Sequence, residues 1–190
     1  MVKQSAPEGP HMPEILMDGR IVEDCWTTWM PTSGEDTAPP DLAPDSKQGL
    51  ILPLSAWTSR KSADPGLGVW LAPNDDPWIL ADAVDSLPVI AVHFPVFTDG
   101  RGYSTAVVLR RHLGYRGVLR AFGDVLVDQA TELSRCGFNC LVPRAGQQAA
   151  AFVARVADFT EPYQASVHPL QPLYRREHRG NGTLHDAQSH

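Results

Sequence analysis

The residues with the clearest potential for chemistry stand together in one stretch, Asp99-Gly100-Arg101-Gly102-Tyr103-Ser104. An apolar run at 87–97 precedes this stretch, and a helical pattern at 105–113 follows it. A glycine-rich turn between a strand and a helix directs backbone N–H groups and the positive end of the helix dipole at an anion. A guanidinium between the two glycines would add a fixed positive charge. The stretch therefore predicts a binding site for a small oxyanion.

Two further segments should reach the same edge of a parallel sheet, because ligands gather at the carboxyl ends of such strands. Gly123-Asp124 follows an apolar run that contains Arg120, and Pro143-Arg144 follows another such run. The planar fork of arginine suits phosphate, sulfite, sulfate and carboxylate groups. Arg120 and Asp124 therefore join the candidates for binding the anion.

The same residues also have purely structural interpretations, which the sequence leaves open. Arg101 would pair with Asp99 or Asp124, and Arg120 would neutralise Asp124 or Asp128. Asp124 and Ser104 stand where the N-cap of a helix is expected. On this interpretation, ion pairs and helix caps account for the polar residues without a ligand.

A third interpretation is a dinucleotide site. The spacing Gly100-x-Gly102-x-x-x-Ala106, between a strand and a helix, loosely matches the dinucleotide-binding pattern, and Asp124 stands where a ribose-binding acid is expected. NADPH or a flavin would then be the cofactor. Arg101 argues against this site, because it places a large cation where the pyrophosphate must approach the backbone. No other cofactor is evident from the sequence.

Strands and helices that alternate along the chain would position these residues. A β-hairpin is predicted around Asp18-Gly19, a dipeptide typical of a type I′ turn. Strands follow at 50–54 and 68–71, and then a helix at 78–87 with Asp76 as its N-cap. The C-terminal half is predicted to contain strands at 89–97, 118–122 and 138–142 and helices at 104–113, 124–136 and 147–159, with Gly114 and Gly137 ending two of them.

This pattern predicts an α/β fold with a parallel sheet. Its βαβαβα C-terminal core would be flavodoxin- or Rossmann-like, or a partial barrel, preceded by the N-terminal β-hairpin and the short strands. We expect one domain at 12–165, a disordered leader at 1–11 and a disordered tail at 166–190. A flexible, acidic, proline-rich loop is expected at 31–49.

Composition limits the possible partners. A formal net charge of −6 argues against nucleic acid. The chain shows neither an apolar run long enough to cross a bilayer nor an apolar signal segment, so we expect a cytoplasmic protein that does not bind membranes.

The cysteines and histidines do not predict a metal site. Three cysteines cannot supply the four thiolates of an iron–sulfur cluster, and no histidine spacing is typical of a metal. We expect Cys136 and Cys140 to be packing residues, and His93 to be a hydrogen-bonded core residue. Core packing or a partner-facing aromatic patch would explain three tryptophans of the N-terminal half: Trp57, Trp70 and Trp78.

Several motifs of the chain resemble one known family. They are Phe94-Pro95-Val96-Phe97-Thr98-Asp99-Gly100-Arg101-Gly102-Tyr103-Ser104, Gly114-Tyr115-Arg116-Gly117, Gly123-Asp124-Val125, Asp128-Gln129 and Arg135-Cys136-Gly137-Phe138. These motifs are similar to a bacterial family of unknown function, number nine-three-four, with weaker similarity over 50–164. Genes of that family typically stand beside the gene for assimilatory sulfite or nitrite reductase.

The resemblance implies that sulfite or nitrite reductase is a partner. Its motifs include Asp128 and Gln129, which we count among the ligand-binding candidates together with Arg135, an arginine predicted to lie on a helix between the strands. We therefore expect an accessory protein or an oxidoreductase of assimilatory sulfite/sulfate reduction. It would bind a small oxyanion or the reductase at the turn 99–104. A dinucleotide-dependent oxidoreductase and a non-catalytic interaction module are the alternatives.

Overall fold

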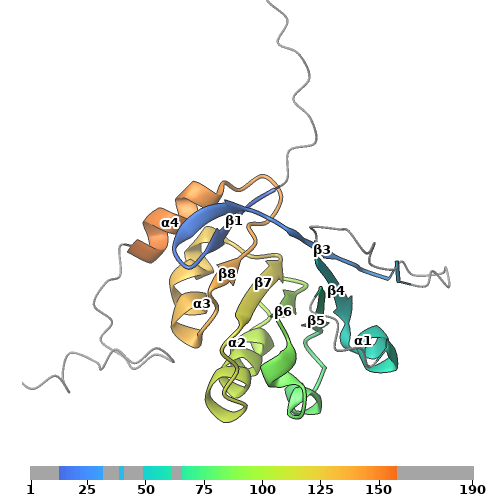
Figure 1. The fold of residues 1–190 in the computed structure, drawn as a ribbon. Coiled ribbons are helices and arrows are strands. Elements are labelled where there is room, and N and C mark those ends of the chain that lie inside the picture. Colours follow the sequence, from blue (N-terminus) through green and yellow to red (C-terminus); the bar gives the residue numbers. More distant parts are fainter. Residues whose placement is uncertain (1–12, 32–38, 41–48, 61–65, 158–190) are drawn as a thin grey trace, which may run out of the picture.

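The computed structural model describes residues 13–31, 39–40, 49–60 and 66–157 (Figure 1). The expected leader, the expected tail and most of the loop at 31–49 lie outside these residues, and so does the end of the last predicted helix. All described strands form one sheet of eight, in the order β2-β1-β8-β7-β6-β5-β4-β3. The strands are β1 (Glu14–Met17), β2 (Arg20–Glu23), β3 (Trp26–Thr28), β4 (Gly49–Pro53), β5 (Leu67–Leu71), β6 (Val89–Phe94), β7 (Val118–Gly123) and β8 (Cys140–Leu141).

Six strands, β3 to β8, are parallel and lie side by side in chain order. The hairpin β1–β2 extends the sheet antiparallel to β8. The parallel α/β core is therefore confirmed. A doubly wound sheet reverses its strand order at a switch point, and no reversal occurs among these six strands. The flavodoxin- or Rossmann-like arrangement is thus not confirmed, and the curled half-barrel is closest to the predicted partial barrel.

The helices lie in an arc on the outer side of the curled sheet, where α3, α2 and α1 follow one another in Figure 1. They are α1 (Leu54–Arg60), α2 (Arg101–Val107), α3 (Ala130–Cys136) and α4 (Ala149–Ala157), and α2 continues as a π turn at Val108–His112. Because consecutive strands are neighbours, right-handed crossovers place their helices on one face. Helix α4 packs against α3 and β1.

Some predicted boundaries are wrong. The helix predicted at 78–87 consists of two 3-10 turns, Pro77–Leu80 and Val84–Ser86. The strand predicted at 89–97 ends at Phe94, because Pro95 has no N–H to continue the ladder. The strand predicted at 138–142 contains only Cys140–Leu141, and the helix predicted at 124–136 has a 3-10 turn, Val127–Gln129, before α3. Strand β3 and helix α1 were not predicted.

Predictions from the residues of turns were more accurate than the predicted boundaries of helices and strands. Asp18 and Gly19 both have positive φ, 49° and 76°, as a type I′ hairpin requires. The Asp76 carboxylate accepts a hydrogen bond from the Trp78 N–H at 3.0 Å, which confirms the predicted cap. Gly114 and Gly137 follow the ends of helices with φ of 70° and 106°.

Both faces of the parallel sheet are buried. Leu71, Val92, Phe94 and Leu119 belong to the core between the sheet and the outer helices. On the inner face, Ile51, Trp70, Val89, Ala91 and Phe122 form a second cluster. A sheet covered on both faces explains why β5 and β6 are almost continuously apolar.

A short link between the two edge strands covers the inner face. Only Asp24 and Cys25 separate the end of β2 from the start of β3. Because an extended residue spans at most about 3.6 Å, these two strand ends lie within roughly 11 Å of each other. The Asp24 N–H donates to the Pro13 carbonyl, and the Gly49 N–H donates to the Cys25 carbonyl, each at 2.9 Å. The link therefore draws both edges of the sheet together, and the sheet must curl.

An ion pair fastens this link to the middle of the sheet. The Asp24 carboxylate accepts two hydrogen bonds from the Arg120 guanidinium of β7, one of them 2.7 Å long. Both side chains are only 4% exposed. Burial alone lowers the pKa of Arg120, but the Asp24 carboxylate raises it above its ordinary value. The prediction that Arg120 pairs with Asp124 or Asp128 is therefore wrong, because its partner is Asp24, 96 residues away.

Removing one partner of this pair should destabilise the fold strongly. Arg120→Met leaves the Asp24 carboxylate buried without its cation, so we expect a loss of about 3–5 kcal/mol in the free energy of unfolding, measured in urea. The double variant Asp24→Leu/Arg120→Met removes both charges and should recover most of that loss. A single variant as stable as the native protein would contradict the role of the pair.

Candidate functional site

The candidate site lies at the carboxyl edge of the sheet, in the loops that follow β5, β6, β7 and β8. The loop after β5 contributes Asn74, and the loop after β6 contributes the turn 99–104. Asp124 follows β7, and Arg144 follows β8. Because parallel neighbours end at the same edge, the curl brings these four loops together.

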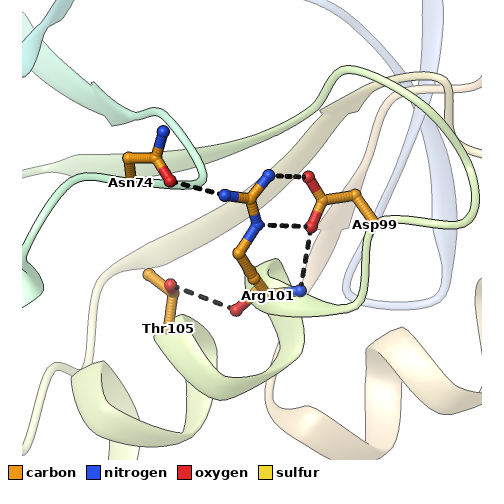
Figure 2. Close-up of polar contacts among 4 residues, drawn as sticks. All are labelled: Asn74, Asp99, Arg101 and Thr105. Carbon is orange, nitrogen blue, oxygen red and sulfur yellow. Dashed lines mark hydrogen bonds and ion pairs between the residues drawn. The ribbon is translucent and has the colours of Figure 1, made fainter.

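Arg101 is held by the chain itself (Figure 2). Its Nε and one terminal nitrogen donate to the two oxygens of Asp99 at 2.9 and 2.6 Å, and its backbone N–H donates to the same carboxylate at 3.1 Å. The other terminal nitrogen donates to Oδ1 of Asn74. The hydrogen bonds from Arg101 lower the pKa of Asp99, and Asp99 raises the pKa of Arg101. The predicted pairing with Asp99 is confirmed, whereas Asp124 is not a partner.

The glycines of the turn have different local roles. Helix α2 begins at Arg101 with Gly100 as its N-cap, so Ser104 lies in its first turn and the predicted Ser104 cap is wrong. A Cβ at Gly102 would lie 2.5 Å from the ring of Phe94, so the helix approaches β6 more closely than any other residue would allow. Nothing lies within 4 Å of a Cβ at Gly100. The Gly-x-Gly spacing thus reflects helix packing at its second glycine.

Asp124 supports the loop after β6 and does not cap a helix. Its Oδ2 accepts the backbone N–H of Phe97 at 3.0 Å, and its Oδ1 accepts a hydrogen bond from Arg144 at 2.9 Å. The Asp124 N–H donates to the carbonyl of Phe94 at 2.7 Å. Asp124 therefore joins the loops after β6, β7 and β8.

Gln129 completes this support from the other side. Its Nε2 donates to the carbonyl of Phe97 at 2.9 Å and contacts the Tyr103 hydroxyl at 3.3 Å. Its Oε1 accepts the N–H of Leu126 at 2.9 Å, which fixes the amide. Burial raises the pKa of the Tyr103 hydroxyl, so Tyr103 remains a neutral partner.

Two apolar side chains remain exposed on this polar support. Val96 and Phe97 are 51% and 52% exposed. An open depression of about 520 Å³ adjoins Arg144 and is lined by Pro13, Glu14 and residues 143–150. The edge is therefore a surface with an apolar centre and neutralised ion pairs.

Two of the predicted site residues lie elsewhere. Arg120 points to the inner face, where Asp24 binds it. Arg135 lies on α3 and pairs with Glu132 at 3.1 Å, one helical turn away. Asp128 is exposed in the same 3-10 turn as Gln129. The turn 99–104, Asp124 and Gln129 are the predicted residues that the structure brings together.

Sequence reasoning missed Asn74 and Asp24 and gave Arg144 no specific role. The turn signal Pro73-Asn74-Asp75-Asp76-Pro77 places Asn74 in a loop. That the loop faces Arg101 depends on β5 and β6 being neighbours, which spacing alone does not show.

The remaining histidine, cysteine and tryptophan predictions have mixed outcomes. His93 is half-buried between Phe122, stacked at 4.9 Å, and Trp70, at 5.6 Å, and burial lowers its pKa. Among the described residues, aromatic packing and not a hydrogen bond holds its ring. Cys140 is buried, and burial raises the pKa of its thiol to about 12, whereas Cys136 is only partly buried.

The three tryptophans of the N-terminal half differ in exposure. Trp70 is buried, Trp57 is half-buried and Trp78 is 52% exposed.

The described residues also bear on metal and membrane sites. Within these ranges, no group of three or more histidine, cysteine, aspartate or glutamate side chains is placed to hold a metal ion. No helix of the described part of the chain is long and apolar enough to cross a membrane.

The packing role of Gly102 can be tested against Gly100 as a matched control. Gly102→Ala should lower the free energy of unfolding by about 1–3 kcal/mol, because the added methyl group forces α2 away from the Phe94 ring. Gly100→Ala should cost less than about 1 kcal/mol, because the N-cap position is open. Urea unfolding of both variants measures the difference, and equal stabilities would contradict the packing role.

Comparison with known proteins gives one match. A search of curated proteins and a search of solved structures each found none. A family model described as bacterial protein of unknown function, DUF934, matches residues 68–174. These residues run from the second residue of β5 through α4, and they include Asn74, Asp99, Arg101, Asp124, Gln129 and Arg144 of the carboxyl edge. The matched span is more than half of the 190 residues, so the chain belongs to this family of bacterial proteins.

Proposed function

We propose that this protein is an accessory protein of assimilatory sulfite reduction and that it binds the reductase through the carboxyl edge of its sheet. The resemblance of the signature motifs supplies the process and the partner. The geometry of the carboxyl edge supports a protein–protein contact, as opposed to a small-ligand site. The proposed place of action is the cytoplasm.

The proposal rests on one observation: both guanidinium groups at this edge are already paired with carboxylates. Arg101 is bound by Asp99, and Arg144 by Asp124, at 2.6 and 2.9 Å. A free sulfite or phosphate ion would have to compete with a carboxylate already held at hydrogen-bond distance. The two ion pairs therefore favour a structural role, in which the arginines fix the loops, over a role in binding an oxyanion.

The exposed centre of the edge supports the same proposal. The main chain of Val96 accepts the Asp99 N–H and that of Phe97 donates to Asp124, each at 3.0 Å, while both side chains are about half exposed. An apolar centre with a polar rim is the usual composition of a protein interface. In contrast, small-molecule sites are typically concave and bury most of the ligand.

The oxidoreductase alternatives receive less support from the glycine pattern. Gly102, the second glycine of the dinucleotide-like spacing, is required by the Phe94 ring beneath it. Asp124, the expected ribose-binding acid, is occupied by the Phe97 N–H and by Arg144. A role as accessory protein accounts for both residues without NADPH or a flavin.

Binding to purified assimilatory sulfite reductase tests the proposal. We expect the native protein to bind the immobilised reductase, and Arg101→Ala to weaken binding about tenfold or more, because the Asp99 turn and its contact with Asn74 are lost. Arg116→Ala, an exposed arginine in the loop before β7, is the matched control and should bind like the native protein.

Three outcomes would contradict the proposal. One is the absence of reductase binding by the native protein. Another is calorimetric binding of sulfite by the free protein that Arg101→Ala abolishes, which would show an oxyanion site. The third is a thermal shift with NADPH or a flavin, which would favour the dinucleotide-dependent oxidoreductase.

A further inference from the structure

We infer that Phe97 is the anchor of the carboxyl-edge surface, and that its partner offers an apolar pocket rimmed by basic side chains. This inference rests on the proposed function and adds the chemistry of the partner's surface.

Phe97 is exposed although its backbone is fixed. Its side chain is 52% exposed, yet its N–H donates to Asp124 and its carbonyl accepts from Gln129, at 3.0 and 2.9 Å. Residues from three successive strand–helix units thus fix the main chain of Phe97. The first unit carries Phe97 itself, the second carries Asp124 and Gln129, and the third carries Arg144, which donates a hydrogen bond to Asp124. Folding alone gains little from a side chain left this exposed.

A fixed, exposed aromatic ring is well suited to binding. Ordering a loop at an interface costs conformational entropy, and a loop already ordered in the free protein avoids that cost. Aromatic anchors that enter a partner's pocket carry much of the energy at protein interfaces. Asp124 and Gln129 are therefore positioning residues, because they hold the main chain of Phe97 without contacting the partner.

Trp78, the other aromatic residue of comparable exposure in the described part of the chain, lacks this arrangement. Trp78 is equally exposed, at 52%, but it lies on a 3-10 turn and its ring is near His112, at 6.0 Å. Side chains from other strand–helix units do not hold its main chain among the described contacts: its N–H donates to Asp76 and its carbonyl accepts from Ala81. Trp78 is thus a control of matched exposure at a different place.

The charge around Phe97 identifies the complementary rim. The described loops of the carboxyl edge that carry the network contain four aspartates and two arginines: Asp75, Asp99, Asp124, Asp128, Arg101 and Arg144. Asp99 and Asp124 are neutralised by the arginines. Asp75 and Asp128 form no ion pair within the described part of the chain, so the rim is negative. Complementarity then requires lysine or arginine around the partner's pocket.

Side-by-side binding measurements with the reductase test this inference. Phe97→Ala should weaken binding at least about thirtyfold while its thermal unfolding stays near that of the native protein, because the ring is exposed. Phe97→Leu should recover part of the affinity. Gln129→Met should weaken binding several-fold, because the anchor keeps its ring but loses one main-chain support. Trp78→Ala should change binding less than about threefold.

Salt and charge variants test the basic rim. Raising the salt concentration should slow association, because screening removes the attraction between the acidic rim and the partner. Asp128→Lys should also slow association.

The results of these measurements distinguish a failure of the proposed function from a failure of the Phe97 anchor. If the native protein does not bind the reductase, the proposed function and the anchor both fail. If Arg101→Ala weakens binding but Phe97→Ala does not, the reductase contact stands and the anchor is wrong. If Trp78→Ala weakens binding more than Phe97→Ala, the main contact lies at the turn Pro77–Leu80, which also overturns the inference. Association that is insensitive to both salt and Asp128→Lys would overturn the basic rim.

Discussion

The buried ion pair between Asp24 and Arg120 is the constraint on which the rest of the structure depends. Two residues join the edge strands β2 and β3, and the carboxylate of the first reaches Arg120 in the middle of the sheet. A buried pair gives little net stability compared with apolar side chains, but a register in which only one charge is buried is strongly disfavoured. The pair therefore selects the curled arrangement over a flat sheet.

The curl in turn determines what the carboxyl edge can do. In the sequential strand order, the loops after β5, β6, β7 and β8 are neighbours in the same order as in the chain. Asn74 can then reach Arg101, and Arg144 can reach Asp124. The polar side chains of the motif 99–104 mainly fix loops, and the apolar Phe97 side chain stays half exposed. This division explains why a motif that contains arginine and glycine need not bind an anion.

Local chemistry explains which features the sequence could predict. The Asp18-Gly19 turn, the Asp76 cap and the Gly137 helix end each depend on residues within a few positions, and all three are present. The Asp99–Arg101 pair is also local, and its prediction is confirmed. The partners of Arg120 and Asp124 are distant in sequence, so spacing pointed to Asp124 or Asp128 for Arg120 and missed Asp24. Strand order was the information that the sequence lacked, because a βα rhythm fits both a doubly wound sheet and a half-barrel.

The central claim is that the carboxyl edge is the surface that binds the reductase. Hydrogen–deuterium exchange of the full chain, free and in complex with assimilatory sulfite reductase, maps that surface directly without any substitution. The account predicts that slowed exchange on binding concentrates at the loop around Phe97, at residues 72–75 directly after β5 and at the loop after β7. Slowed exchange confined to the hairpin β1–β2, or to the turn that carries Trp78, would contradict it.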